Sequence, residues 1–213
     1  MDQPKVSCIL ITADRPTFIN IAIENFLEQD YVNRELIIID DGQESCHHLI
    51  PDVSNIRYFY SKALGTLGRK RNIACEKATG EIIVHMDDDD WYAPNWISRH
   101  VDTMLTTRAD ITGLNMVKFH SRELKISFVF ERFENDNTWL CGATLAYKKK
   151  IWEKYPFANL QIGEDTDFIR NSGGRIVPFE FINGFTGGLH SGNISIKYIT
   201  DIVPKFDSNY MLI

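Results

Sequence analysis

The chain has 213 residues, of which 44% are hydrophobic, and its 23 basic and 29 acidic side chains give a formal net charge of −6. That balance argues against a protein that coats nucleic acid, which would carry a basic face, and the length allows a sizeable core in one α/β domain. No apolar run approaches the roughly 18–20 residues that span a bilayer, so we expect no transmembrane segment.

The cysteines and the N-terminus indicate the compartment. None of the four cysteines belongs to a CxxC pair, so neither a zinc ribbon nor a redox motif is predicted. The N-terminus lacks the features of a secretory signal, and a reducing compartment suits unpaired cysteines. We therefore expect a cytoplasmic protein, peripheral to a membrane at most. The sequence Cys46-His47-His48 could bind a metal, although adjacent residues rarely converge on one ion.

The first half of the chain alternates short apolar runs with helical patterns. Apolar runs predict buried strands at residues 6–11 (VSCILI), 36–39 (LIII), 56–60 and 82–86. Helical patterns cover residues 16–27, 66–78 and 94–106, and the first and last of them start at a proline. This alternation predicts a mostly parallel sheet covered by helices.

The second half has a different pattern. Residues 110–120 and 124–130 alternate as the two strands of a hairpin do, and further strands are predicted at 138–147 and 175–181. Helices are predicted at 148–155 and 164–171, and the glycine-rich stretch GFTGGLHSGN, residues 184–193, is expected to be flexible. The chain ends on NYMLI without a polar tail, which is consistent with a fragment of a longer protein.

Polar clusters follow three of the predicted strands, at residues 12–15, 40–41 and 87–90. In parallel sheets ligands bind outside the carboxyl ends of the strands, so these clusters should converge on one crevice. The last cluster is four consecutive aspartates. Two unit charges 4 Å apart interact by about 4 kcal/mol at an effective dielectric near 20, so this cluster needs a partner that compensates the repulsion.

Six blocks of the sequence together resemble the family 2 glycosyltransferases of GT-A fold. They are VSCILITADRP, LIIIDDGQES, GRKRNIACEKATGEIIVHMDDDDWYAP, WLCGATLAYKK, GEDTDF and LHSGNIS, in this order between about residues 6 and 195. The resemblance implies one GT-A domain over residues 1–213: a mostly parallel, Rossmann-like central sheet flanked by helices, with a smaller mixed or antiparallel portion on the acceptor side. Residues 1–107 would form the nucleotide-binding half, and 108–213 the half with the acceptor site and the catalytic base.

The resemblance also implies an activity. Members of this family move a sugar from a nucleotide diphosphate donor to an acceptor hydroxyl, usually with Mn2+ or Mg2+ and usually with inversion at the anomeric carbon. For this chain it implies a UDP-sugar donor and a glycan or other glycoconjugate as acceptor. A divalent cation would explain the aspartates, since hard carboxylate oxygens suit Mg2+ or Mn2+ and the cation stabilises charge on the departing nucleotide.

The family's D-x-D motif maps onto Asp87 and Asp89. The resemblance makes Asp89 the direct metal ligand and places Asp87 and Asp88 against the ribose or metal-bound water. His190, in LHSGNIS, matches a position where some relatives have a third ligand to the metal or the diphosphate. The alternatives are an exposed acidic loop for the aspartates and an ordinary loop residue for His190.

Four residues of the first two polar clusters are expected to bind the nucleotide. Thr12, Asp14 and Asp41 match positions that hold uracil and ribose in the family, and Arg15 lies in the same cluster. A carboxylate such as Asp41 can accept the N3–H of uracil. The usual family residue at Asp14 is asparagine, which leaves its contact open, and both aspartates have an alternative role in caps or turns.

Further candidates come from the GRKRN and WLCGA blocks. Arg71 matches the family arginine that faces the ribose or diphosphate, whereas Arg69 and Lys70 are expected to be solvated helix residues. Gly142 would let the donor sugar approach closely, and Trp139 would either stack on a sugar or pack in the core.

The acidic pair of GEDTDF supplies the catalytic residues. By resemblance Asp165 is the general base that accepts the proton of the acceptor hydroxyl, and Glu164 and Asp167 orient it. The alternative is that these side chains only favour a helix N-terminus. Two other functions stay open: a nucleotidyltransferase, which would normally have a glycine-rich loop where TADRP stands, and a nucleotide-sugar-binding module without turnover.

Overall fold

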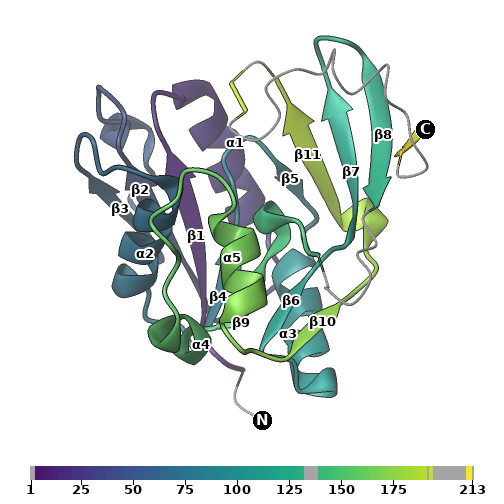
Figure 1. Cartoon of the computed structure of the whole chain (residues 1–213). Coiled ribbons are helices and arrows are strands. Elements are labelled where there is room, and N and C mark those ends of the chain that lie inside the picture. The colour runs from purple at the N-terminus through teal and green to yellow at the C-terminus, as the bar shows by residue number, and fades with distance from the viewer. Residues whose placement is uncertain (1–2, 132–138, 191, 194–209, 213) are drawn as a thin grey trace.

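The computed structural model describes residues 3–131, 139–190, 192–193 and 210–212 of the chain. Within these residues a seven-stranded sheet has the order β10-β6-β9-β4-β1-β2-β3, and all neighbours pair in parallel except β9, which runs against both β4 and β6 (Figure 1). Its strands are β1 (Val6–Thr12), β2 (Arg34–Asp40), β3 (Ile56–Tyr60), β4 (Ile82–His85), β6 (Ile111–Gly113), β9 (Ala146–Lys148) and β10 (Ile176–Pro178).

A smaller, mixed sheet stands beside the larger one. Among the described residues it has the order β12-β8-β7-β11-β5, with only β11 and β7 parallel. Its strands are β5 (Trp91–Tyr92), β7 (Met116–Ser121), β8 (Ile126–Glu131), β11 (Phe185–Leu189) and β12 (Tyr210–Leu212). The two sheets confirm the predicted fold class, a mostly parallel sheet with a smaller mixed portion.

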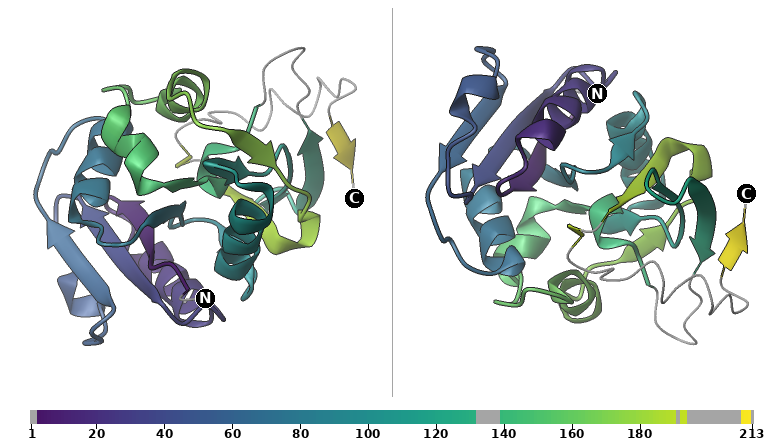
Figure 2. Two further views of the ribbon diagram at one scale, coloured as in Figure 1. Left: turned by 90° about the horizontal axis from the view of Figure 1, so that it is seen from below. Right: turned by 90° about the horizontal axis from the view of Figure 1, so that it is seen from above.

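Helices cover both faces of the larger sheet, as the end-on views show (Figure 2). The helices are α1 (Pro16–Leu27), α2 (Leu67–Lys77), α3 (Trp96–Thr107), α4 (Lys149–Lys154) and α5 (Glu164–Asn171), with 3-10 turns η1 (His47–Leu49), η2 (Gly142–Thr144) and η3 (Ile182–Gly184). In β2, Leu36 and Ile38 join the core under α1 and α3, whereas Ile37 and Ile39 join the core under α2 and α5. Successive side chains point to opposite faces, so a strand buried on both sides is apolar throughout.

Local signals place the helices of the first half. Pro16 occupies the first turn of α1, where its missing N–H costs nothing. The side chain of Thr66 caps α2 by accepting the backbone N–H of Arg69 (3.3 Å). The predicted helix from residue 94 starts slightly later, at Trp96, and Trp96 is fully buried.

Four expectations for the second half are wrong in part. The predicted strand 110–120 is divided, because β6 belongs to the larger sheet and β7 to the smaller one. Of the predicted strand 138–147, residues 142–144 form the 3-10 turn η2, only the end forms β9, and residue 138 lies outside the described residues. The glycine-rich stretch contains the strand β11. The predicted strand 175–181 is limited to residues 176–178. The proposed division at residue 107 stays a prediction.

Candidate active site

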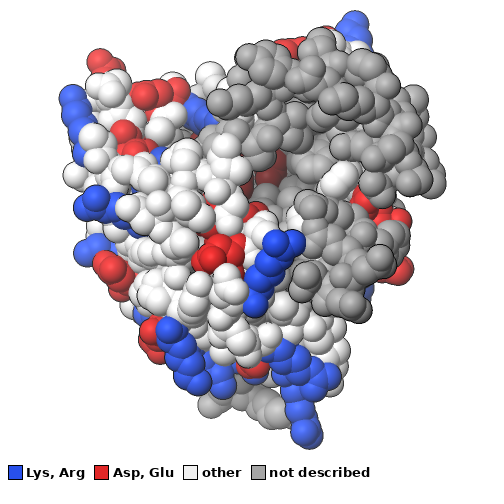
Figure 3. All heavy atoms as spheres, viewed as in Figure 1, with Lys and Arg blue, Asp and Glu red and all other residues white. Residues whose placement is uncertain are grey.

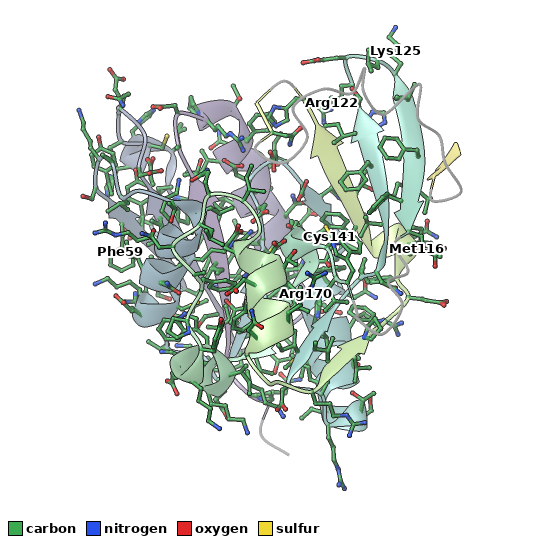
Figure 4. All side chains as sticks on the ribbon, in the orientation of Figure 1. Phe59, Met116, Arg122, Lys125, Cys141 and Arg170 are labelled. Atoms are coloured by element: carbon green, nitrogen blue, oxygen red, sulfur yellow. The ribbon has the colours of Figure 1, made fainter. Side chains whose placement is uncertain are left out.

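Two of the three predicted clusters, residues 12–15 and 87–90, contribute to one cleft of about 950 Å³ at the carboxyl ends of β1 and β4, whereas residues 40–41 do not line it. Acidic side chains are visible at the bottom of a hollow in the face shown in Figure 3. The starts of α2 and α5, the turn η2 and the smaller sheet complete the lining. Figure 4 labels Cys141, one of the lining residues, between α5 and the smaller sheet.

The first wall joins the end of β1 to the aspartates after β4. The hydroxyl of Thr12 donates to Oδ2 of Asp88 (2.7 Å), and Nη1 of Arg15 donates to Oδ1 of Asp88 (2.8 Å) and Oδ2 of Asp89 (3.0 Å). Burial alone would lower the pKa of Arg15, but Asp88 and Asp89 raise it above its usual range. Arg15 therefore stays charged and offsets part of the repulsion within the cluster.

Residues after β11 reach the same aspartates. The Nε2–H of His190 donates to Oδ2 of Asp89 (3.0 Å), and the amide of Asn193 donates to the same oxygen (3.1 Å). The ring of His190 stacks on Phe18, with 4.9 Å between centroids. His190 is thus held beside the cluster, and its role as a ligand to the metal or the diphosphate stays a prediction. Asn193, which lies in the LHSGNIS block but was not singled out there, joins the site as well.

Burial and mutual repulsion raise the pKa of carboxylates in the cluster. Burial raises the pKa of Asp87 to about 6, with Arg71 opposing this and the neighbouring Asp89 and Asp88 adding to it. Burial and the charge of Asp89 raise the pKa of Asp90 well above its usual range, although Asp90 accepts the backbone N–H of Gly188 (2.9 Å). A further cation in this part of the cleft would stabilise the ionised forms.

The donor set suits a divalent cation held by few protein ligands. Among the described residues, no three or more His, Cys, Asp or Glu side chains converge as a metal cage. Mg2+ commonly keeps several waters and binds through one or two carboxylates and substrate phosphates. Asp89 is suited to be such a carboxylate, because it lines the open cleft among other acidic groups.

The opposite wall is built on a buried ion pair. Nη1 of Arg71, in α2, donates to Glu164 at the start of α5, and both side chains are only 3% exposed. Nη2 of Arg71 lies 3.7 Å from Oδ2 of Asp87. Burial raises the pKa of Glu164, and Arg71 counteracts it. Arg71 therefore connects α5 to the aspartate run.

Asp165 lines the cleft one residue beyond this pair. Its Oδ1 accepts the backbone N–H of Thr166 (2.6 Å) in the first turn of α5, where negative charge is favourable. Its other oxygen lies against Gly142: a Cβ at this glycine would be 2.0 Å from Oδ2. The structure thus accounts for Gly142 by the proximity of Asp165, whereas the sequence suggested the proximity of a sugar.

Two predicted nucleotide ligands are absent from the lining of the cleft. Of the described residues, neither Asp14 nor Asp41 lines it. Asp14 has a positive φ of 55° and accepts the backbone N–H of Gln43 (2.6 Å), which is a turn role. Asp41 accepts from Nζ of Lys70 (2.8 Å). Lys70 is therefore buried and paired, not solvated as predicted, whereas Arg69 is exposed.

The smaller sheet gives the cleft an apolar, aromatic wall. Side chains of β7, β8 and β11, with Trp139, supply it: Phe119, Phe128, Phe130, Phe185 and Leu189. The rings of Phe130 and Trp139 meet edge to face with 5.3 Å between centroids. Trp139 thus both packs against the ring of Phe130 and lines the cleft.

Residues 7–161 match the family described as Glycosyl transferase family 2. The chain belongs to glycosyl transferase family 2. An uncharacterized glycosyltransferase of Haemophilus influenzae is 30% identical over 120 residues, which are 54% of this chain and 48% of the relative. A GalNAc(5)-diNAcBac-PP-undecaprenol beta-1,3-glucosyltransferase of Campylobacter jejuni is 32% identical over 95 residues, 41% of this chain and 30% of the relative. The chain thus spans about half or less of the length of these relatives.

Solved structures show the same fold. The structure of Staphylococcus aureus TarS residues 1–349 in complex with UDP-GlcNAc matches with a TM-score of 0.69 and 16% identity, covering 92% of this chain and 62% of that one. The mannosyltransferase PcManGT from Pyrobaculum calidifontis, in complex with GDP-Man and Mn2+, matches with a TM-score of 0.65 and 16% identity, covering 89% and 57%. The fold is GT-A. In the described part of this family member, no helix has the length and apolar character to cross a membrane.

Proposed function

We propose that this chain transfers a sugar from a UDP-sugar to a hydroxyl of a glycan or glycoconjugate, with a divalent cation and with inversion. One observation carries the proposal: a single cleft is lined both by the aspartate run, residues 87–90, and by Asp165. An acidic cation site beside a separate carboxylate is what leaving-group stabilisation and proton removal require.

The aspartate wall would bind the donor diphosphate. Asp89 would hold Mn2+ or Mg2+, with Asp87 as a further contact, and the bound cation would stabilise negative charge on the departing nucleotide. His190 suits a diphosphate oxygen better than the metal, because its Nε2 carries the proton and its Nδ1 accepts the N–H of Gly192 (3.1 Å). Arg15 would offer its guanidinium to the same oxygens.

Asp165 would act as the general base in a single displacement. The acceptor oxygen forms the new bond to the anomeric carbon, the bond from that carbon to the diphosphate oxygen breaks, and the acceptor proton passes to Asp165. Glu164 would keep the first turn of α5 in place through its pair with Arg71. Attack from the side opposite the leaving group gives inversion.

The nucleotide and the acceptor follow from other parts of the cleft. The TarS structure with UDP-GlcNAc favours a uridine nucleotide, and PcManGT, with GDP-Man and Mn2+, supports the use of a cation. The aromatic wall favours a carbohydrate acceptor, since sugar rings present apolar C–H faces. The name of the Campylobacter relative agrees with an acceptor that already carries sugars.

The test is isothermal titration of UDP and several UDP-sugars, with Mn2+ and with EDTA, on wild type and Asp89→Ala. Asp110→Ala is a matched control, because Asp110 pairs with Lys148 and does not line the cleft. We expect Mn2+-dependent binding in wild type and the control, and its loss in Asp89→Ala. No UDP binding in either condition would refute the donor assignment, and binding without transfer across a broad acceptor panel would indicate a binding module.

A further inference from the structure

A buried chain of hydrogen bonds leads from the core of the larger sheet to the glycine beside Asp165. Nδ1 of His85, the last residue of β4, lies 2.7 Å from the carbonyl oxygen of Gly142. Nε2 of His85 lies 3.3 Å from the hydroxyl of Tyr147, which lies 3.2 Å from Sγ of Cys75. His85, Tyr147 and Cys75 are fully buried. The resemblance to the family assigned no role to any of these three.

The acceptor at one end of this series of hydrogen bonds determines which atom donates in each of them. The carbonyl of Gly142 can only accept, so Nδ1 of His85 carries the proton and donates. In the neutral ring Nε2 then accepts from the hydroxyl of Tyr147, and that oxygen can accept the S–H of Cys75. The imidazole is thereby held at both nitrogens, which leaves it one tautomer and one orientation.

Two sets of contacts connect Tyr147 to the surroundings of Asp165. The hydroxyl of Tyr147 contacts His85, and His85 donates to the carbonyl of Gly142 (2.7 Å), which also accepts the backbone N–H of Leu145 at the longer distance of 3.4 Å. The ring of Tyr147 packs on Phe168 of α5, with 4.8 Å between centroids, and α5 carries Asp165 in its first turn. The glycine and the helix that meet at the carboxylate are thus located by the same side chain.

Gly142 lies so close to Asp165 that a shift of its backbone would move the carboxylate. A Cβ there would lie 2.0 Å from Oδ2 of Asp165 and 3.1 Å from its Cβ. The position of the Gly142 backbone therefore determines where the Asp165 carboxylate can lie. Displacements of about 1 Å near reacting groups can cost 100-fold in rate.

We propose that His85 is a positioning residue for Asp165, acting through the carbonyl of Gly142. This rests on the proposed function, in which Asp165 is the base. His85 touches neither donor nor acceptor, since it is buried beneath the cleft and absent from its lining. It holds the turn η2 so that the carboxylate fits against the glycine and points at the acceptor hydroxyl.

Two amide variants separate this role from general packing. In His85→Asn the amide nitrogen is attached to Cγ, like Nδ1 of histidine, and can still donate to Gly142. In His85→Gln the amide lies one bond further out, near the place of Nε2, and the donor to Gly142 is lost. We expect kcat to fall about 10- to 100-fold in His85→Gln and to stay within about threefold of wild type in His85→Asn. The Kd for UDP with Mn2+ should be unchanged in both.

A double-variant cycle with Asp165→Asn completes the test. If His85 acts through the base, His85→Gln should cause little further loss of kcat in the Asp165→Asn background. Wild-type kcat in His85→Gln, equal losses in both amide variants, or a full additional loss in the Asp165→Asn background would overturn the inference. If His85→Gln does not fold, Tyr147→Phe removes the hydroxyl that contacts Nε2 of His85 and Sγ of Cys75 and keeps the ring, and a normal kcat in that variant would also overturn the inference.

Failure of the proposed function would be visible separately. Asp165→Asn alone reports on the base, because it leaves His85 and Gly142 unchanged. If Asp165→Asn transfers sugar at the wild-type rate, Asp165 is not the base, and the positioning role falls with it. If Asp165→Asn is inactive and His85→Gln is normal, only the positioning role is refuted.

Discussion

Gly142 offers a direct test of how closely Asp165 is held. In Gly142→Ala the new Cβ would lie 2.0 Å from Oδ2 of Asp165, whereas ordinary contacts begin at 3.4 Å. The carboxylate or the turn η2 must therefore shift by about 1.4 Å. A misplacement of that size near the reacting atoms costs about 100-fold, so we expect kcat to fall by roughly that factor.

The assay compares turnover with donor binding. Release of UDP in the presence of acceptor gives kcat, and titration of UDP with Mn2+ gives Kd, which should stay within about threefold because the proposed diphosphate site is at the aspartate run and not at Gly142. Gly174→Ala is a matched control: its Cβ would meet Ile111 side-chain atoms at 3.0 Å, and it does not line the cleft. A Gly142→Ala enzyme with normal kcat would refute the argument that this contact places the base.

Three further predictions concern charge. Arg71→Met leaves a buried carboxylate of α5 without its partner, and we expect it to lower the free energy of unfolding by about 3–5 kcal/mol in urea titrations; a loss below about 1 kcal/mol would contradict the buried pair. Lys70→Met should cost about 1–3 kcal/mol by unpairing Asp41, whereas the exposed Arg69→Met should cost less than about 0.5 kcal/mol, and equal costs would count against the pair. Because the pKa of Asp87 is raised to about 6, the folded protein holds this proton more tightly than the unfolded chain, and stability is lost as pH rises through about 6. Asp87→Asn should therefore raise Tm at pH 8 in EDTA, with a gain that shrinks toward pH 4; a gain independent of pH would contradict the shift.

The first half of the fold could be predicted from the sequence because its signals are local. The continuous apolar runs of β1 and β2 reflect burial on both faces, and Pro16 and Thr66 mark helix starts. The convergence of residues 12–15 and 87–90 at one cleft followed from the direction of the parallel strands, whereas the third polar cluster, residues 40–41, does not line that cleft.

The second half depends on contacts between distant residues, which no local pattern records. β11 contains two glycines and looked like a loop, but Gly187 packs against the ring of Phe119 on β7, and a Cβ at Gly188 would lie 2.1 Å from the carbonyl oxygen of Asp89. The two-residue strand β5 exists only because β11 pairs with it.

Local sequence patterns also failed to show which side chains of the site contact each other. Lys70 is a charged residue of a helix, a type that is usually solvated. Only the fold brings it to Asp41, 29 positions away in sequence. His85 looked like one more residue of an apolar strand, since its partner Gly142 is 57 positions away. Spacing predicted which residues reach the cleft, whereas the pairs that support them required the three-dimensional arrangement.

The reversed direction of β9 has a consequence for how the chain can be divided. β9 belongs to the second half of the sequence, yet it is inserted between β4 and β6 and forms hydrogen bonds with both. A chain cut near residue 107 would leave β4 as an apolar strand with one unpaired edge, and such edges recruit other strands. The segments before and after residue 107 are therefore parts of one folding unit, and as separate pieces they would be suited to reassemble with each other.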